Sequence, residues 1–264
     1  MIRTRNLFYS KQERLFSIWR ILRLLLISVP LVIITNKLFV LLKLPFGFSP
    51  IAKLIFIASI ILVTIFLDKE RIQDLGLELK MKSILYIIAG IVWAYFLYIQ
   101  CESICTIKSN TAFQFVNPFT IDNILSLGYY LLFIGLSEEL MFRGYMISNI
   151  SRDTNYIIAL IISAILFSLI HLGSGDSIKN ILLMGFTFTI FFGLIFIMTK
   201  NIFLAIGFHG AWDTFERLFH PLFKSADIGS NTILIILLIN VFIFYLIFRK
   251  RLNFDIKTLT KHCP

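Results

Sequence analysis

The stretch Ser137-Glu138-Glu139-Leu140-Met141-Phe142-Arg143-Gly144 places two adjacent carboxylates and a guanidinium inside an otherwise apolar segment. It follows a mostly apolar run from Ile124 to Leu136. Within a bilayer each such charge costs about 2.5–3.5 kcal/mol on insertion scales, and charges in this position usually mark function. A structural ion pair inside a polar bundle is the alternative for this stretch taken alone.

The two carboxylates are expected to have different roles on a helix. Successive side chains lie about 100° apart around a helix, so Glu138 and Glu139 point in different directions. Glu139 and Arg143 are four residues apart, which is the spacing of an ion pair on one helix face. We therefore expect Glu139 to pair with Arg143, and Glu138 to have no partner on its own helix.

The composition indicates a membrane protein. The 264 residues are 58% hydrophobic and 15% charged, with a mean hydropathy of +0.87, whereas soluble domains contain about 25% charged residues. The net charge of +10 is compatible with nucleic-acid binding. However, most Lys and Arg residues lie in tails and loops between apolar runs, which is the pattern that orients membrane proteins. We expect the lipid bilayer as a partner and no nucleic acid.

Apolar runs of about 20 residues are long enough to cross a membrane as helices. The chain contains eight candidates, which predict an all-α polytopic bundle of about eight transmembrane helices: 24–42, 51–67, 83–100, 123–148, 156–172, 178–199, 202–219 and 232–248. We divide the chain into a basic tail with three spans (1–119), a core of four spans (120–220), and a last span with a basic tail (221–264). The connection 101–122 is the longest polar one.

The distribution of basic residues predicts the orientation. If the N-terminus is cytoplasmic, the inner segments hold seventeen Lys and Arg residues and the outer connections hold four. Basic residues are enriched on the cytoplasmic side of membrane proteins. The sequence therefore predicts a multi-pass protein of the cell membrane with both termini in the cytoplasm, and with 101–122 and 220–231 outside.

Two other predicted spans carry ionisable residues. The fifth span ends with Phe167-Ser168-Leu169-Ile170-His171, and the seventh contains His209-Gly210-Ala211-Trp212-Asp213. His209 and Asp213 are four residues apart and share a helix face. A lone intramembrane His is often only an interhelical hydrogen-bond partner. At about 1.5 Å per residue, however, Glu138, His171, His209 and Asp213 can meet in one chamber near mid-membrane. Such a group suits hydrolysis by an activated water, with oxyanion or metal binding as the second function.

These residues resemble the motifs of the CPBP intramembrane proteases, which include type II CAAX prenyl endopeptidases and bacterial Abi-type proteins. The motifs are Glu138-Glu139-x-x-x-Arg143, Phe167-x-x-x-His171 and His209-x-x-x-Asp213, in the family's order. The resemblance covers about residues 120–220 and implies an eight-helix fold. It implies that Glu138 and His171 activate water, and that His209 and Asp213 support an oxyanion or a metal. Glu139, Arg143 and Phe167 then have structural roles. The third motif ends in Asp where the family usually has Asn.

The resulting prediction is an intramembrane endopeptidase that cleaves a membrane-associated protein or peptide. A CAAX protein, a peptide pheromone or a bacteriocin precursor is a plausible substrate, and self-immunity to a bacteriocin is a plausible role. One alternative is a non-catalytic scaffold or immunity factor of the same fold. A proton-coupled transporter is another, because Glu and His inside spans also build proton relays. Against it, the sequence lacks the paired half-repeats that are typical of carriers.

The sequence leaves two chemical types open, a glutamate-type protease and a metalloendopeptidase. Glu138, His171, His209 and Asp213 are the candidate ligands if zinc is present. No His-Glu-x-x-His motif occurs, so the usual soluble zinc-protease helix is absent. We favour a water-activating Glu–His pair without an obligatory tightly bound metal.

Overall fold

The computed structural model describes residues 15–43, 48–109, 120–172, 178–219, 229–248 and 256–260. These residues are almost entirely helical, and their long helices follow the eight predicted spans, so the predicted all-α class is confirmed. The long elements are α2 (Ser17–Leu41), α3 (Phe48–Leu62) with its π-helical extension η1 (Val63–Leu67), α4 (Met81–Ser109), a continuous helix over 121–153, α8 (Tyr156–Ile170), α9 (Ile178–Thr199), α10 (Phe203–Phe219) and α12 (Gly229–Phe248).

Within the described ranges, four helices are long and apolar enough to cross a membrane: Ser17–Leu41, Pro50–Leu67, Met81–Ile107 and Ile121–Asp153. Their outer surfaces are apolar. On α2, for example, Leu26, Val40 and Leu41 are each more than 70% exposed. Contiguous apolar surface of this kind is unfavourable in water and favourable against lipid. The chain is a multi-pass membrane protein, as its composition predicts.

Two helix ends differ from the prediction by seven or more residues. The helix α4 continues to Ser109, although the sequence predicts a polar connection from residue 101. Cys101 and Cys105 face the core in this added part and are buried, which explains why the helix continues. The rest of that predicted connection, 110–119, lies outside the described residues. At the other end of the molecule, α2 begins at Ser17 rather than at residue 24.

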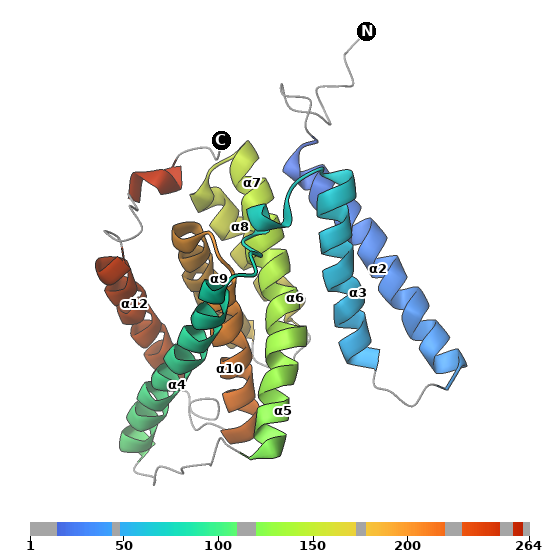
Figure 1. Cartoon of the computed structure of the whole chain (residues 1–264). Coiled ribbons are helices and arrows are strands. Elements are labelled where there is room, and N and C mark those ends of the chain that lie inside the picture. The colour runs from blue at the N-terminus through green and yellow to red at the C-terminus, as the bar shows by residue number, and fades with distance from the viewer. Residues whose placement is uncertain are drawn as a thin grey trace.

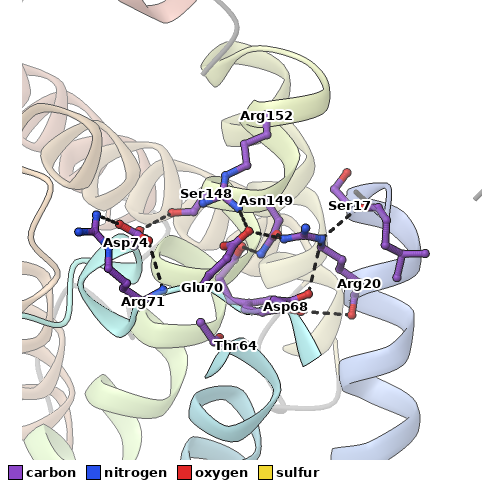
Figure 2. Close-up of polar contacts among 12 residues, drawn as sticks. Ser17, Arg20, Thr64, Asp68, Glu70, Arg71, Asp74, Ser148, Asn149 and Arg152 are labelled. Atoms are coloured by element: carbon purple, nitrogen blue, oxygen red, sulfur yellow. Dashed lines mark hydrogen bonds and ion pairs between the residues drawn. The ribbon is translucent and has the colours of Figure 1, made fainter. Parts of the chain in front are cut away.

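A polar cluster explains how α2 can begin so early with charged residues. Arg20 Nη1 donates to Glu70 Oε1 at 2.6 Å, and Arg23 Nη2 lies 2.5 Å from Asp68 Oδ1. Arg152 of α7 (Ser148–Asp153) also pairs with Glu70. Figure 2 shows Arg20, Asp68, Glu70 and Arg152 where α2, the connection 68–80 and α7 meet.

The two acids of this cluster respond differently to their surroundings. Burial raises the pKa of Asp68 and outweighs the hydrogen bond from Tyr145 and the charges of Arg20 and Arg23. Burial also acts to raise the pKa of Glu70, but the hydrogen bonds from Arg152 and Arg20 outweigh it and the pKa is lowered. Glu70 is therefore the member of this cluster that its basic partners hold ionised.

Close packing places α10 at the centre of the bundle. Figure 1 shows α10 between α4 and the long helix 121–153, and both contact it. At Gly207 an added Cβ would collide with the backbone of Ile87 on α4, and at Gly210 it would lie 2.8 Å from Leu131 Cα on the long helix. Small residues permit this backbone approach. The approach carries the polar face of α10 up to the carboxylates of the long helix.

Candidate active site

The long helix 121–153 has a wider, π-helical segment on each side of Glu138 and Glu139. It runs without interruption through α5 (Ile121–Tyr129), η3 (Tyr130–Gly135), α6 (Leu136–Glu139) and η4 (Leu140–Ile147) to α7. Both η3 and η4 are π-helical. Local π-helical turns change the direction of the side chains that follow and often occur at functional sites. The short α-helical piece α6 therefore presents Glu138 and Glu139 from between two irregular segments.

Glu139 is fully buried and joins two other charged side chains. Its Oε1 lies 3.1 Å from Arg143 Nη1, which is the pair that the i,i+4 spacing predicts. The same oxygen lies 2.7 Å from His209 Nδ1 on α10. A carboxylate only accepts hydrogen bonds, so Nδ1 carries the proton and donates it. Glu139 thus fixes the orientation of His209, a contact that spacing along the chain does not reveal.

Phe167 and Arg143 pack against each other and support the site from below. The Arg143 guanidinium is 4.9 Å from the centre of the Phe167 ring and 5.2 Å from that of Phe192. Phe167 also packs against His171, with ring centres 4.5 Å apart. These aromatic faces surround a buried cation where water does not reach it. The first residue of the Phe167-x-x-x-His171 motif therefore supports both the guanidinium and the imidazole.

His171 lies directly after α8 and has a fixed ring orientation. Its Nδ1 is 2.8 Å from the carbonyl oxygen of Phe167. A carbonyl accepts, so Nδ1 donates and Nε2 remains available to the site. Nε2 of His171 is 3.9 Å from Oε2 of Glu138. The His171 side chain is 37% exposed, which is more than the side chains of Glu138, His209 and Asp213.

Glu138 lies between the two imidazoles. Its Oε2 is 3.9 Å from Nε2 of His209 as well as from Nε2 of His171. This oxygen is buried and has no hydrogen-bond partner among the described residues. Asp213 completes the group, with Oδ2 3.6 Å from His209 Nε2. The structure thus places Glu138, His171, His209 and Asp213, from three helical regions, close to one another.

Lys53 on α3 also contacts the site, although no sequence motif includes it. Its Nζ donates to Oε1 of Glu138 at 3.0 Å. Glu138 has no partner on its own helix, but it is not unpaired. Lys53 is 85 residues away in the chain, so neither a motif nor a helical spacing connects the two. The only sequence signal for this contact is that Lys53 is a basic residue inside an apolar span. Such a residue usually has a carboxylate partner.

The described residues do not form a ready metal site. No three His, Cys, Asp or Glu side chains among them are grouped closely enough to hold an ion. Two ligand atoms that each lie about 2.1 Å from a tetrahedral zinc ion are about 3.4 Å apart from each other. The corresponding separations around Glu138 and His209 are 3.6–3.9 Å. The donor types match zinc, whereas their spacing is wider than a zinc site requires.

A carboxylate–histidine centre buried between the spans of a polytopic helical protein is an arrangement that suits hydrolysis. Comparison with known families agrees. Residues 120–215, which include all three motifs, match the Rce1-like family of type II CAAX prenyl endopeptidases. The match confirms the predicted resemblance for these residues, which make up about a third of the chain. No curated protein matches the chain.

Proposed function

We propose that the protein cleaves a peptide bond of a membrane-associated protein or peptide, using a water molecule activated by Glu138 and His171. One observation carries this proposal. Oε2 of Glu138 is buried without a hydrogen bond among the described residues and faces Nε2 of both His171 and His209 at 3.9 Å. This separation is too long for a direct hydrogen bond, whereas one water molecule can bridge it.

The proposed chemistry follows from the two fixed imidazoles. The water transfers one proton to Oε2 of Glu138 and keeps the other, which it donates as a hydrogen bond to Nε2 of His171, while its oxygen attacks the scissile carbonyl carbon. The tetrahedral intermediate carries the negative charge on the former carbonyl oxygen. His209, protonated between the carboxylates of Glu139 and Asp213, donates from Nε2 to this oxygen. The proton held by Glu138 then passes to the leaving amine as the carbon–nitrogen bond breaks.

The substrate is proposed at the level of its class. The family acts on membrane-associated chains, and the site lies between apolar helices, so we propose a CAAX-type protein or a short hydrophobic peptide such as a pheromone or a bacteriocin precursor. Purified protein in liposomes is incubated with peptides of these classes, and cleavage is followed by mass spectrometry. Loss of a general base typically lowers turnover by about 10²–10⁴-fold.

The matched variant is Glu138→Gln, which keeps the size of the side chain and removes the base. We expect it to abolish cleavage and to leave the melting temperature nearly unchanged. Near-normal cleavage by Glu138→Gln contradicts the assignment. Absence of cleavage by the unmodified protein across all the peptides, with an unaltered cellular phenotype for Glu138→Gln, favours the non-catalytic scaffold instead.

The proposal needs no tightly bound metal. The alternative uses Glu138, His171, His209 and Asp213 as ligands, with zinc supplying Lewis-acid activation of the water. A Glu138 bound to zinc is not free to act as the base, so the two mechanisms make different predictions. Metal content is measured on the purified protein, and activity is measured after chelation and zinc readdition. Stoichiometric zinc, with activity lost on removal and restored by zinc, contradicts our preference.

A further inference from the structure

Lys53 reaches the candidate active site from a helix outside the family-matched core. It lies in the second turn of α3, whereas the match covers residues 120–215. Its ammonium group donates to Oε1 of Glu138 at 3.0 Å. The Lys53 side chain is 28% exposed and the Glu138 side chain only 12% exposed. The pair therefore connects the more open side of the site to a largely buried acid.

This contact makes the two oxygens of Glu138 unequal. Oε1 is occupied by Lys53, while Oε2 faces the two imidazoles. Without a hydrogen bond at Oε1, a carboxylate can turn about its terminal bond, because that torsion has a broad energy minimum. A fixed cation on Oε1 limits this rotation. It holds Oε2 toward the place that the attacking water occupies.

The other charged groups around Glu138 are already engaged elsewhere. Arg143, on the same long helix, pairs with Glu139. His209 donates to Glu139 through Nδ1 and faces Asp213 through Nε2. His171 uses Nδ1 for the carbonyl of Phe167. The cation that binds Glu138 directly therefore comes from α3.

We propose that Lys53 is a positioning residue for hydrolysis: its ammonium group binds Oε1 of Glu138 and so makes Oε2 the oxygen that takes the proton from water. This inference rests on the proposed role of Glu138 as the base. Lys53 itself touches neither the reacting carbonyl nor the water. Its loss should impair the chemical step and leave substrate binding almost unchanged, because misplacing a catalytic group lowers turnover.

The first test compares Lys53→Met with Lys53→Arg in the peptide-cleavage assay. Lys53→Met has a similar length and no charge, and we expect kcat to fall by about tenfold or more with KM changed less than about twofold. Lys53→Arg keeps the cation and is expected to retain kcat within about threefold. Lys37→Met, an exposed lysine on the neighbouring helix α2, is the control and should behave like the unmodified protein.

Chemical rescue separates the charge from a packing effect. Lys53→Cys is made in a background that carries Cys101→Ala, Cys105→Ala and Cys263→Ser and that retains cleavage. The new thiol is alkylated with 2-bromoethylamine, which restores an ammonium group at nearly the same distance, or with iodoacetamide, which does not. We expect the first reagent to restore most of the lost kcat and the second to restore none.

The outcomes distinguish this inference from the proposed function. If Glu138→Gln abolishes cleavage while Lys53→Met keeps the kcat of the unmodified protein, only the role of Lys53 is wrong. A Lys53→Met variant with raised KM and unchanged kcat shows that Lys53 binds substrate, which also overturns the inference. Equal recovery with both reagents contradicts a role for the charge. Retained cleavage by Glu138→Gln removes the basis for both proposals.

Discussion

Arg143 and Glu139 are both fully buried, yet neither faces the place proposed for the water. Glu139 Oε1 contacts Arg143 and His209, which lie on two different helices. Arg143 in turn packs against Phe167 of α8 and Phe192 of α9. The Glu139–Arg143 pair therefore connects four helical regions. Glu139 also fixes the tautomer of the His209 imidazole.

We predict that Arg143→Ala lowers the folded yield and the melting temperature strongly. Its removal takes the guanidinium away from the buried Glu139 carboxylate, and breaking a buried ion pair in this way costs about 3–5 kcal/mol. Thermal unfolding in detergent and size-exclusion profiles measure the effect. Arg217→Ala removes an exposed arginine from α10 and is expected to be nearly neutral. Equal stability of the two variants contradicts the structural role of Arg143.

The sequence predicts part of this arrangement for a physical reason. The pairing of Glu139 with Arg143 depends only on the 3.6-residue period of a helix, which is a local property. The contacts of Glu138 with Lys53 and of Glu139 with His209 join residues 85 and 70 positions apart. Such contacts depend on how helices pack, and no local spacing encodes that.

At the scale of elements, the contact between α4 and α10 depends on glycine. An added Cβ at Gly207 would collide with the carbonyl of Ile87, and one at Gly90 with the carbonyl of Leu204. Both obstacles are backbone atoms, which cannot move aside as a flexible side chain can. The two helices must separate to accommodate any side chain at these positions.

We therefore expect Gly207→Ala to lower both stability and cleavage. Separation of α10 from α4 displaces His209, two residues further along α10, from its contacts with the carboxylates. Gly128→Ala is the matched control, because a Cβ there meets nothing within 4 Å and alanine favours the helix. Melting temperature and cleavage rate are measured for both variants. A Gly207→Ala protein as stable as Gly128→Ala would show that the helices do not pack at this distance.

The polar cluster around Glu70 predicts a dependence of stability on pH. Burial acts to raise the pKa of Glu70, but the hydrogen bonds from Arg152 and Arg20, together with the charges of these arginines, lower it below its ordinary value of 4.5. Its contribution is therefore complete above that value and is lost as the pH falls through the lowered pKa. We expect Glu70→Gln to lower the melting temperature at pH 7 and to lose less further stability between about pH 5 and pH 3.

Glu78→Gln provides the control for this titration. Glu78 lies in the same connection and is 45% exposed beside Lys80, so its replacement should leave the pH profile almost unchanged. The pKa of Asp68 is raised by burial, so its titration changes stability with pH in the opposite direction. This contribution is present in the unmodified protein and in both variants. The informative quantity is thus the difference between the variants. Parallel curves for Glu70→Gln and Glu78→Gln would contradict the assigned role of Glu70.

The elements themselves are largely predictable, since hydropathy sets where a span occurs. The predicted spans 178–199 and 202–219 lie within one residue of α9 and α10. The early start of α2 is not predictable from hydropathy, because Arg20 and Arg23 are tolerated only through Asp68 and Glu70. The π-helical segments beside Glu138 are likewise invisible, since widening a turn leaves the average hydropathy unchanged.

For the whole molecule, the pair of helices α2 and α3 contacts the core at two separate depths. Figure 1 shows this pair at one side of the bundle, beside the long helix 121–153. Near one end of the bundle, Arg20 and Arg23 bind the connection that follows α3. Deeper, Lys53 binds Glu138. A part of the chain outside the family-matched core therefore completes the surroundings of the proposed base.

The basic residues of the chain predict how the whole molecule is oriented in the membrane. Seventeen Lys and Arg residues lie in the segments predicted to be inside, against four outside, and this bias predicts that both termini are cytoplasmic. In Figure 1 the connection that precedes α4 and the start of α5 lie at opposite ends of the bundle. Lys80 and Asp122 are exposed residues at these two places.

Single cysteines at these two positions test the orientation in a cysteine-free background. An impermeant maleimide should label Asp122→Cys in intact cells, and should label Lys80→Cys only after the membrane is permeabilised. Both positions are exposed, so a difference in labelling reports the side of the membrane and not burial in the protein. The reverse pattern would place the polar cluster around Glu70 outside the cell. It would also show that the basic residues do not set the orientation of this chain.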